Sequence, residues 1–342
     1  MKYLIIAFLF LLSCAEKQRT PVITLNVQDS STESSFRGLS VVNDSVAWAG
    51  GSNGTVLTTS DYGKNWLNVS NGLPDSVDFR DIEGFSASTA VIMAVGSPGM
   101  FFRTSDGGKN WSLTYRDDRP QIFFDAMGFW DEQHGIAFGD AIDGYIEIVR
   151  TNDGGATWYR APEDERPVAL EGEGGFAASG TCIITYGDSL VWIGLGAPES
   201  RVAFSSNRGK AWSIINSPMA QEAGSAGIFS LAFNTSKFGI AVGGDYMNRS
   251  DTTKLIARTS DGGANWNLVE NNGLNGQKSA VTPVADSQLW LASGATGVNA
   301  SFDNGSSWSL IDSTGYYTIQ MASKKSGWLT GPSGRIARLN IN

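Results

Sequence analysis

Short runs of hydrophobic residues, separated by turn-forming residues, follow one another along most of the chain. In the first complete unit these runs span residues 36–42, 46–50, 55–59 and 66–69. Apolar or alternating runs of this length, bounded by Gly, Asn and Asp, predict β-strands joined by tight turns. No long stretch has the 3.6-residue periodicity of an amphipathic helix. The pattern therefore predicts an all-β protein.

An eight-residue phrase, Ser/Thr-x-Asp-x-Gly-x-x-Trp, follows the third run of a unit and occurs six times. Its third position falls at residues 61, 106, 153, 207, 261 and 303, so successive copies lie 45, 47, 54, 54 and 42 residues apart. Repeats of this period indicate a β-propeller with one four-stranded antiparallel blade per unit. Within the phrase, Asp and Gly favour a tight turn, and Trp begins the next strand with a large apolar ring.

We interpret the phrase as a structural turn, because a catalytic group is needed once whereas a fold-forming turn is needed in every repeat. Backbone amides can satisfy the carboxylates, so the turns do not require Ca²⁺. Tryptophans recur in the second runs as well, and ten of the eleven belong to the repeat. The turn and core positions of the six copies are Asp61 and Trp66, Asp106 and Trp111, Asp153 and Trp158, Asn207 and Trp212, Asp261 and Trp266, and Asp303 and Trp308.

A seventh unit, at the C-terminal end, is incomplete. Residues 317–322, 327–331 and 335–339 match the first three strands of a blade, and no fourth run follows them. The N-terminal run at residues 22–27 supplies a candidate for the missing strand. Pairing of these two segments would close the ring and remove its open sheet edges. We therefore predict a single seven-bladed propeller over residues 22–342.

The N-terminal residues have the pattern of a secretory signal. Lys2 precedes an apolar run at residues 3–12, which is too short to span a bilayer as a mature helix. Leu11-Leu12-Ser13-Cys14 resembles the bacterial lipobox, in which the cysteine becomes the lipidated first residue. We predict a signal peptide over residues 1–13, lipidation at Cys14 and a tether over residues 14–21. The prediction is an exported cell-envelope lipoprotein that faces the periplasm or the cell surface.

The composition excludes several classes of function. A net charge of −9 argues against a nucleic-acid partner, which requires a basic surface. His134 is the sole histidine, so no histidine-based metal site or nucleophile can be built. Cys182 is the only cysteine besides Cys14, and its apolar neighbours predict a buried thiol rather than a disulfide. We expect no cofactor and no metal.

The repeated phrase is similar to the Asp-box, which occurs in sialidases, sortilin-type receptors, xyloglucan hydrolases and the photosystem II assembly and stability factors. Residues 36–42, 46–56 and 59–66 resemble the first blade of the last family, and residues 327–336 resemble its last blade. That resemblance implies a seven-bladed propeller that serves as a binding platform during assembly of a membrane complex. The family's inner-strand arginines map to Arg37 and Arg80, whereas Phe124-Asp125, Phe229-Ser230 and Tyr317-Thr318 carry no arginine.

Two functions follow from these observations. The first is a non-catalytic, lipid-anchored platform that binds a protein partner through the face opposite the Asp-box turns, with Arg37, Arg80, Asp125 and Glu173 as candidate binding residues. The alternative is a glycan-active propeller, sialidase-like or another glycoside hydrolase, with Asp140, Glu171, Asp245 and Tyr246 as candidates on the same face. Glycosidases need two facing carboxylates, and the Arg-Ile-Pro signature of sialidases is absent from this sequence.

Overall fold

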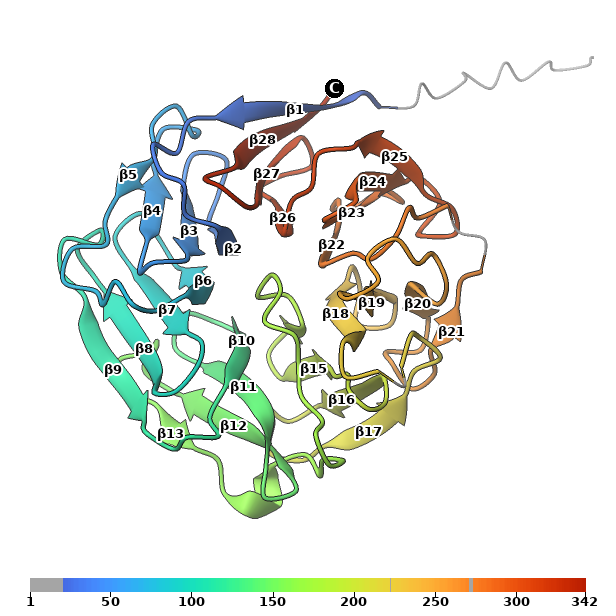
Figure 1. Ribbon diagram of the computed structural model, residues 1–342, viewed down its shortest axis with the longest axis horizontal. Coiled ribbons are helices and arrows are strands. Elements are labelled where there is room, and N and C mark those ends of the chain that lie inside the picture. The colour runs from blue at the N-terminus through green and yellow to red at the C-terminus, as the bar shows by residue number, and fades with distance from the viewer. Residues whose placement is uncertain (1–20, 222, 271–272) are drawn as a thin grey trace, which may run out of the picture.

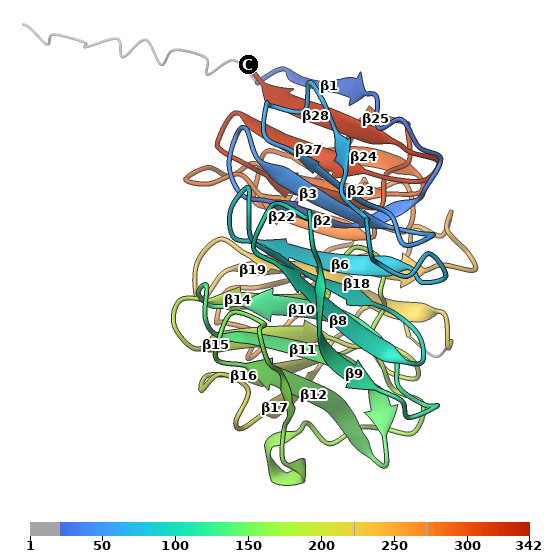
Figure 2. The ribbon, with the colours of Figure 1, turned by 90° about the vertical axis from the view of Figure 1, so that its left-hand side faces the viewer.

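The computed structural model describes residues 21–221, 223–270 and 273–342. Within these residues the strands form seven four-stranded antiparallel sheets, arranged as blades around a central axis (Figure 1). Figure 2 shows the ring from the side, with the strands crossing the thickness of the disc. The predicted seven-bladed β-propeller is confirmed. The predicted signal peptide, Cys14 and most of the tether lie outside the described residues, and none of the described helical segments is long and apolar enough to cross a membrane.

Each blade is built from consecutive strands, numbered from the channel outwards. Blade 1 comprises β2 (Phe36–Val41), β3 (Ala47–Gly51), β4 (Val56–Thr59) and β5 (Leu67–Asn68), and blade 2 comprises β6 (Phe79–Gly84), β7 (Ala90–Ala94), β8 (Gly99–Thr104) and β9 (Ser112–Asp117). Blade 3 comprises β10 (Phe124–Phe129), β11 (Gly135–Ile142), β12 (Tyr145–Thr151) and β13 (Tyr159–Arg160), followed by the 3₁₀ turn η1 (Glu163–Glu165).

The remaining blades follow the same order. Blade 4 comprises β14 (Ile183–Tyr186), β15 (Leu190–Gly194), β16 (Arg201–Ser205) and β17 (Ser213–Asn216), and blade 5 comprises β18 (Ala226–Phe233), β19 (Gly239–Asp245), β20 (Ile256–Thr259) and β21 (Asn267–Leu268). Blade 6 comprises β22 (Ala280–Pro283), β23 (Trp290–Gly294), β24 (Gly297–Ser301) and β25 (Ser309–Asp312). Blade 7 comprises β26 (Thr318–Met321), β27 (Ser326–Thr330) and β28 (Ile336–Ile341), with β1 (Ile23–Gln28) as its fourth strand.

The N-terminal strand closes the ring as the sequence predicts. β1 pairs antiparallel with β28 from Ile23 opposite Ile341 to Gln28 opposite Ile336, and the two strands lie side by side in both views (Figures 1 and 2). At the end of this ladder the Gln28 side chain accepts hydrogen bonds from the indole N–H groups of Trp66 in blade 1 (2.9 Å) and Trp328 in blade 7 (3.2 Å). The closing strand thereby joins the first and last blades.

Tryptophans fill the spaces between blades. Those of the second strands, Trp48, Trp192, Trp290 and Trp328, are fully buried. The rings of Trp66 and Trp328 pack edge to face with their centroids 6.5 Å apart, and this contact crosses from blade 1 to blade 7. Aromatic pairs in this geometry add to the stabilisation that burial of their surface provides. The repeat places such a ring at the boundary between successive blades.

The Asp-box forms the turn between the third and fourth strands of a blade and satisfies its own polar groups. In the first copy, the Asp61 carboxylate accepts the Asn65 backbone N–H at 3.0 Å, the Asn65 side-chain amide at 2.7 Å and the Thr59 hydroxyl at 3.0 Å. Gly63 has φ 75°, a conformation that glycine adopts without strain. In the fourth copy the Asn207 amide oxygen accepts the corresponding backbone N–H at 2.9 Å. A neutral acceptor therefore suffices, as expected for a turn.

We expect Trp158→Ala to lower the free energy of unfolding by about 3–5 kcal/mol, because the ring is lost from a well-packed core. Trp158 is 8% exposed and packs edge to face on Phe101 of blade 2, with centroids 4.9 Å apart. Urea unfolding at pH 7 measures the change. Tyr159→Ala, at the next position with 43% exposure, is the control and should cost less than about 1 kcal/mol. Equal losses in the two variants would contradict a core role for the Asp-box tryptophan.

Candidate functional site

A β-bulge lies near the start of the inner strand in several blades. The pairing register shifts at Arg37 in β2, at Arg80 in β6, at Asp125 in β10 and at Phe229 in β18. Inner strands begin on the face opposite the Asp-box turns, so these residues share one end of the channel. A bulge leaves one residue unpaired and redirects its side chain. The same backbone feature therefore presents a different side chain from each of these blades.

The structure corrects the sequence alignment of blade 5 by one residue. The sequence pairs Ser230 with Arg37, whereas the register shift falls at Phe229. Ser230 is fully buried, and its hydroxyl accepts the backbone N–H of Val281 in blade 6 at 3.0 Å. Phe229 therefore stands where blades 1 and 2 have arginines. Its ring stacks on that of Phe176, with centroids 4.2 Å apart.

Residues 172–181, between blades 3 and 4, run across the central channel, and we call them the channel-crossing segment. In Figure 1 the green loop that precedes β15 projects toward the centre of the ring. Its far end reaches blade 6, where the Ser179 hydroxyl donates to the Ser279 carbonyl at 2.6 Å. Small residues allow this close approach: a Cβ on Gly180 would lie 2.4 Å from a carboxylate oxygen of Asp81. The segment is thus held by inner-strand residues of blades distant in sequence.

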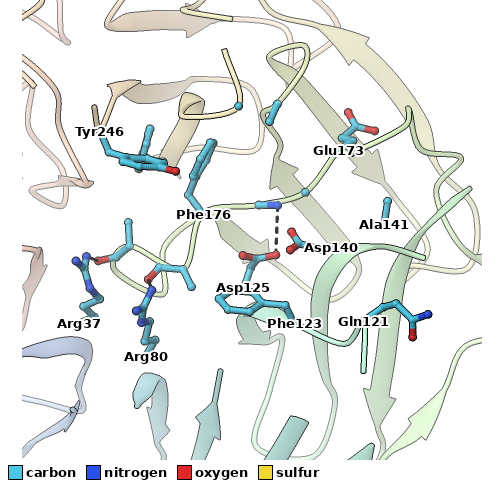
Figure 3. Close-up of a pocket in the computed structure, with 18 of the residues that line it drawn as sticks. Arg37, Arg80, Gln121, Phe123, Asp125, Asp140, Ala141, Glu173, Phe176 and Tyr246 are labelled. Atoms are coloured by element: carbon cyan, nitrogen blue, oxygen red, sulfur yellow. Dashed lines mark hydrogen bonds between the residues drawn. The ribbon is translucent and has the colours of Figure 1, made fainter. Parts of the chain in front are cut away.

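A cavity of about 610 Å³ opens at the channel mouth, with part of the channel-crossing segment in its wall, and we call it the mouth cavity. Pockets of this size hold small ligands or short peptide segments. Figure 3 shows the arginines and the aspartates on different walls, with Phe176 and Tyr246 near them. Its wall includes Arg37, Arg80, Arg249, Phe123, Asp125, Asp140, Phe176, Phe229 and Tyr246. Further along the channel, a second cavity of about 380 Å³ has Gly180 and Thr181 in its wall.

The guanidinium groups of Arg37 and Arg80 lie side by side on one wall (Figure 3). Arg37 donates from Nη1 to the Ala178 carbonyl at 3.0 Å, and Arg80 donates to the Ala177 carbonyl at 3.5 Å. Arg37 also lies over the ring of Tyr317, 3.9 Å from its centroid. Burial and the nearby positive charges lower the pKa of Arg37 to about 10. Because Nε of Arg80 is buried without a hydrogen-bond partner, this wall retains an unsatisfied donor.

Asp125 and Asp140 form another wall, where their carboxyl groups lie close together against the backbone of Gly174 and Gly175 (Figure 3). Both come from bulges, Asp125 in β10 and Asp140 in the adjacent strand β11. The backbone N–H of Gly175 donates to Asp125 Oδ2 at 3.2 Å (Figure 3). Asp125 is 1% exposed, and its Oδ1 receives no hydrogen bond from a protein donor. We call this arrangement the aspartate pair.

Two carboxyl groups close together in a buried site cannot both ionise readily, so the aspartate pair keeps its protons to higher pH than isolated aspartates do. Burial is the first cause that raises the pKa of Asp125 well above its ordinary range, and the neighbouring charge of Asp140 is the second. Burial raises the pKa of Asp140 from 3.8 to about 6. The pair therefore gains negative charge between mildly acidic and neutral pH.

The other predicted site residues lie in different settings. Glu173 is 1% exposed in the cavity wall, but Arg201 donates to it from Nε at 2.6 Å, so its charge is already neutralised. Tyr246 lines the cavity and is half-exposed. Glu171 is exposed and lies outside the cavity wall. Asp245 also lies outside the wall, where it accepts a backbone N–H from two residues later at 2.8 Å.

Sequence reasoning missed Phe176, Phe229 and Arg249 as parts of one site, and it missed the channel-crossing segment. The signal for the segment was the longer spacing of 54 residues between the third and fourth phrases, together with a run of Gly, Ala and Ser. Spacing alone could not say that the extra residues enter the channel. Phe229 was hidden by the one-residue error in alignment.

Comparisons with known proteins agree with this architecture. The family model for photosynthesis system II assembly factor YCF48 matches residues 17–120, which include the first two blades. The structure of YCF48 bound to D1 peptide aligns with a TM-score of 0.63 at 18% identity, over 92% of this chain and 96% of that one. YCF48 from Cyanidioschyzon merolae aligns with a TM-score of 0.61 at 17% identity, over 92% and 98%. The chain is similar to YCF48 in fold. No curated protein matches it.

We expect Asp140→Asn to raise stability at pH 7 by about 2–3 kcal/mol, the equivalent of a two-unit pKa shift. Its folded-state pKa of about 6 exceeds the ordinary 3.8, so ionisation costs stability as the pH rises through this interval. The cost is absent well below pH 4 and complete above about pH 6. Urea unfolding between pH 4 and pH 8 measures it, with the exposed Asp118→Asn as control. An unchanged pH profile in Asp140→Asn would show that its carboxyl is not perturbed.

Proposed function

We propose that this chain is a non-catalytic binding propeller that holds a segment of a protein partner in the mouth cavity. The observation that carries the proposal is the set of bulged inner-strand residues that meet at one cavity, with Arg37, Arg80, Asp125 and Phe229 contributed by four blades. Charged donors, acceptors and aromatic faces around a space of about 610 Å³ suit an extended peptide, which has alternating polar and apolar groups.

Two further observations support a protein partner. Tyr246, in the cavity wall, and Met247, the next residue along the chain, are 43% and 77% exposed, and exposed apolar side chains near a cavity are typical of protein-binding surfaces. The solved structure of YCF48, which has the same fold, is bound to D1 peptide. In our proposal the partner of this chain is likewise a polypeptide segment.

The glycan-active alternative is less well supported by the geometry. Catalytic carboxyl groups of glycosidases lie roughly 5–9.5 Å apart, so that a nucleophile or a water molecule can act on the sugar. The carboxyl groups of Asp125 and Asp140 instead lie next to each other, against the backbone of Gly174 and Gly175 (Figure 3). Glu171 and Asp245, the other candidate acids, lie outside the cavity wall. We therefore favour binding over hydrolysis.

We expect the double substitution Arg37→Gln and Arg80→Gln to lower peptide binding at least tenfold, because charged hydrogen bonds contribute about 1.5–3 kcal/mol each. A random octapeptide phage library is selected on the immobilised full chain, and the affinities of selected peptides are measured with both proteins. Arg116→Gln is the control, since Arg116 pairs with Asp118 at the surface. Failure to select peptides above background, or equal affinity for the double variant, would contradict the proposed site.

We also propose that the chain is anchored to the cell envelope by lipid on Cys14. Cys14→Ser should then move the protein from the membrane fraction to the supernatant after cell lysis and centrifugation. Cys182→Ala is the matched control, because Cys182 is fully buried in the propeller. An unchanged distribution of the Cys14→Ser protein would contradict the lipid anchor.

A further inference from the structure

The mouth cavity has positively and negatively charged groups on different walls, and binding of a neutral peptide backbone does not explain this separation. Arg37, Arg80 and Arg249 supply positive charge, of which Asp78 offsets part by pairing with Arg80 at 3.6 Å, and the aspartate pair supplies negative charge. Figure 3 shows Arg37 and Arg80 apart from Asp125 and Asp140. Arg80 is close enough to lower the pKa of Asp125 by its charge, yet none of the three arginines forms a salt bridge with the pair in the described residues. The two charged walls therefore face the cavity instead of neutralising each other.

Asp125 in particular is incompletely satisfied. Its side chain is almost wholly buried and lines the mouth cavity, and Oδ1 receives no hydrogen bond. A buried carboxyl oxygen without a donor costs free energy unless a ligand or a proton supplies one. In the free protein a proton retained by the aspartate pair reduces this cost. A ligand with several N–H donors and a positive charge would replace that proton.

We propose that the aspartate pair is a subsite for an ammonium group, supplied by a lysine side chain or by the free N-terminus of the bound segment. The inference rests on the proposed peptide-binding function and states the chemistry of its ligand. An ammonium group has three donors for closely spaced oxygens and a full charge to offset both carboxylates. Phe176, beside the pair, and Tyr246, across the cavity, add aromatic rings, whose faces attract cations (Figure 3).

Other occupants fit this wall less well. Among the described residues no group of three or more His, Cys, Asp or Glu side chains could hold a metal ion. Sugar hydroxyls could donate to the pair, but they bring no positive charge to replace the proton that the pair retains. A guanidinium group is wide and planar, whereas Gly174 packs tightly over Asp140: a Cβ there would lie 1.8 Å from a carboxylate oxygen. The compact ammonium group suits this restricted approach.

The proposal implies that binding depends on pH. As the pH rises from 5 to 7.5 the pair gains negative charge, because the pKa of Asp140 is about 6, while a lysine side chain stays protonated and a free N-terminus largely does, so affinity increases. The ionisable groups that face the pair come from the elements around it: Arg80 from β6, paired with Asp78, Glu173 from the channel-crossing segment, paired with Arg201, Cys182 ahead of β14, and Arg37, Arg249 and Tyr246 across the cavity. Burial and the nearby carboxylates raise the pKa of the Cys182 thiol, so it stays neutral over this range.

The first test uses the selected octapeptides. Each is synthesised unmodified, with acetylated lysines, and with an acetylated N-terminus, and binding to the full chain is measured at pH 7.5 and pH 5. We expect one of the two acetylations to weaken binding at least tenfold, which identifies the source of the ammonium group, and affinity at pH 5 to be lower. The double variant Asp125→Asn and Asp140→Asn should lose this discrimination, while Asp118→Asn retains it. Selected peptides that bind equally in all forms would overturn the subsite and leave the peptide site standing.

The second test does not depend on any peptide. n-Butylammonium chloride should raise the melting temperature of the wild-type chain in a saturable manner at pH 7.5, and less at pH 5, relative to equal concentrations of tetramethylammonium chloride. The double Asn variant should show no difference between the two salts. Equal responses of wild type and variant would overturn the subsite. A specific response without selectable peptides would retain the subsite and contradict the proposed function.

Discussion

Closure of the ring by β1 is the interaction on which the rest of the structure depends. The sheet of each blade packs against the sheets of its two neighbours, so one unpaired edge would leave the ring free to open at that point. The ladder from Ile23 to Gln28 against β28 removes that edge, and Gln28 then joins Trp66 and Trp328 across the junction. The mouth cavity combines residues of blades 1, 2, 3 and 5. Their positions relative to one another are fixed only in a closed ring.

Within that ring, the invariant and the variable parts of each blade have separate tasks. The Asp-box turns lie on one face of the ring and the strand tryptophans lie in the core. The residue types of both are nearly the same in each copy. The bulged position on the opposite side carries arginine, arginine, aspartate and phenylalanine in blades 1, 2, 3 and 5. The repeat therefore provides an equivalent bulged position in each of these blades. A different side chain at that position in each blade forms the site without changing the core.

The fold could be predicted almost completely from the sequence, because its determinants are local. Each strand and each Asp-box turn is encoded by a short stretch of residues, and so is the run at residues 22–27. The spacing of the repeats then indicates the propeller. The site depends on contacts distant in sequence. Arg37 and Arg80 could be located by resemblance, but their contact with Ala178 and Ala177 joins residues about a hundred positions or more apart. Small residues in a long loop give no periodic signal for such a crossing.

The contrast between two buried aspartates separates structural from functional acid groups in this channel. Asp81 is 5% exposed, in the wall of the second cavity, and its two oxygens accept the backbone N–H groups of Met127 at 2.7 Å and Ile82 at 2.8 Å. Asp125, one blade further, has the same kind of burial but a single backbone donor, and it adjoins a second carboxyl. A structural role would be served by the arrangement around Asp81. Asp125 instead keeps one oxygen without a hydrogen bond, beside Asp140 and in the wall of a cavity. This arrangement is expected where a ligand completes the hydrogen bonding.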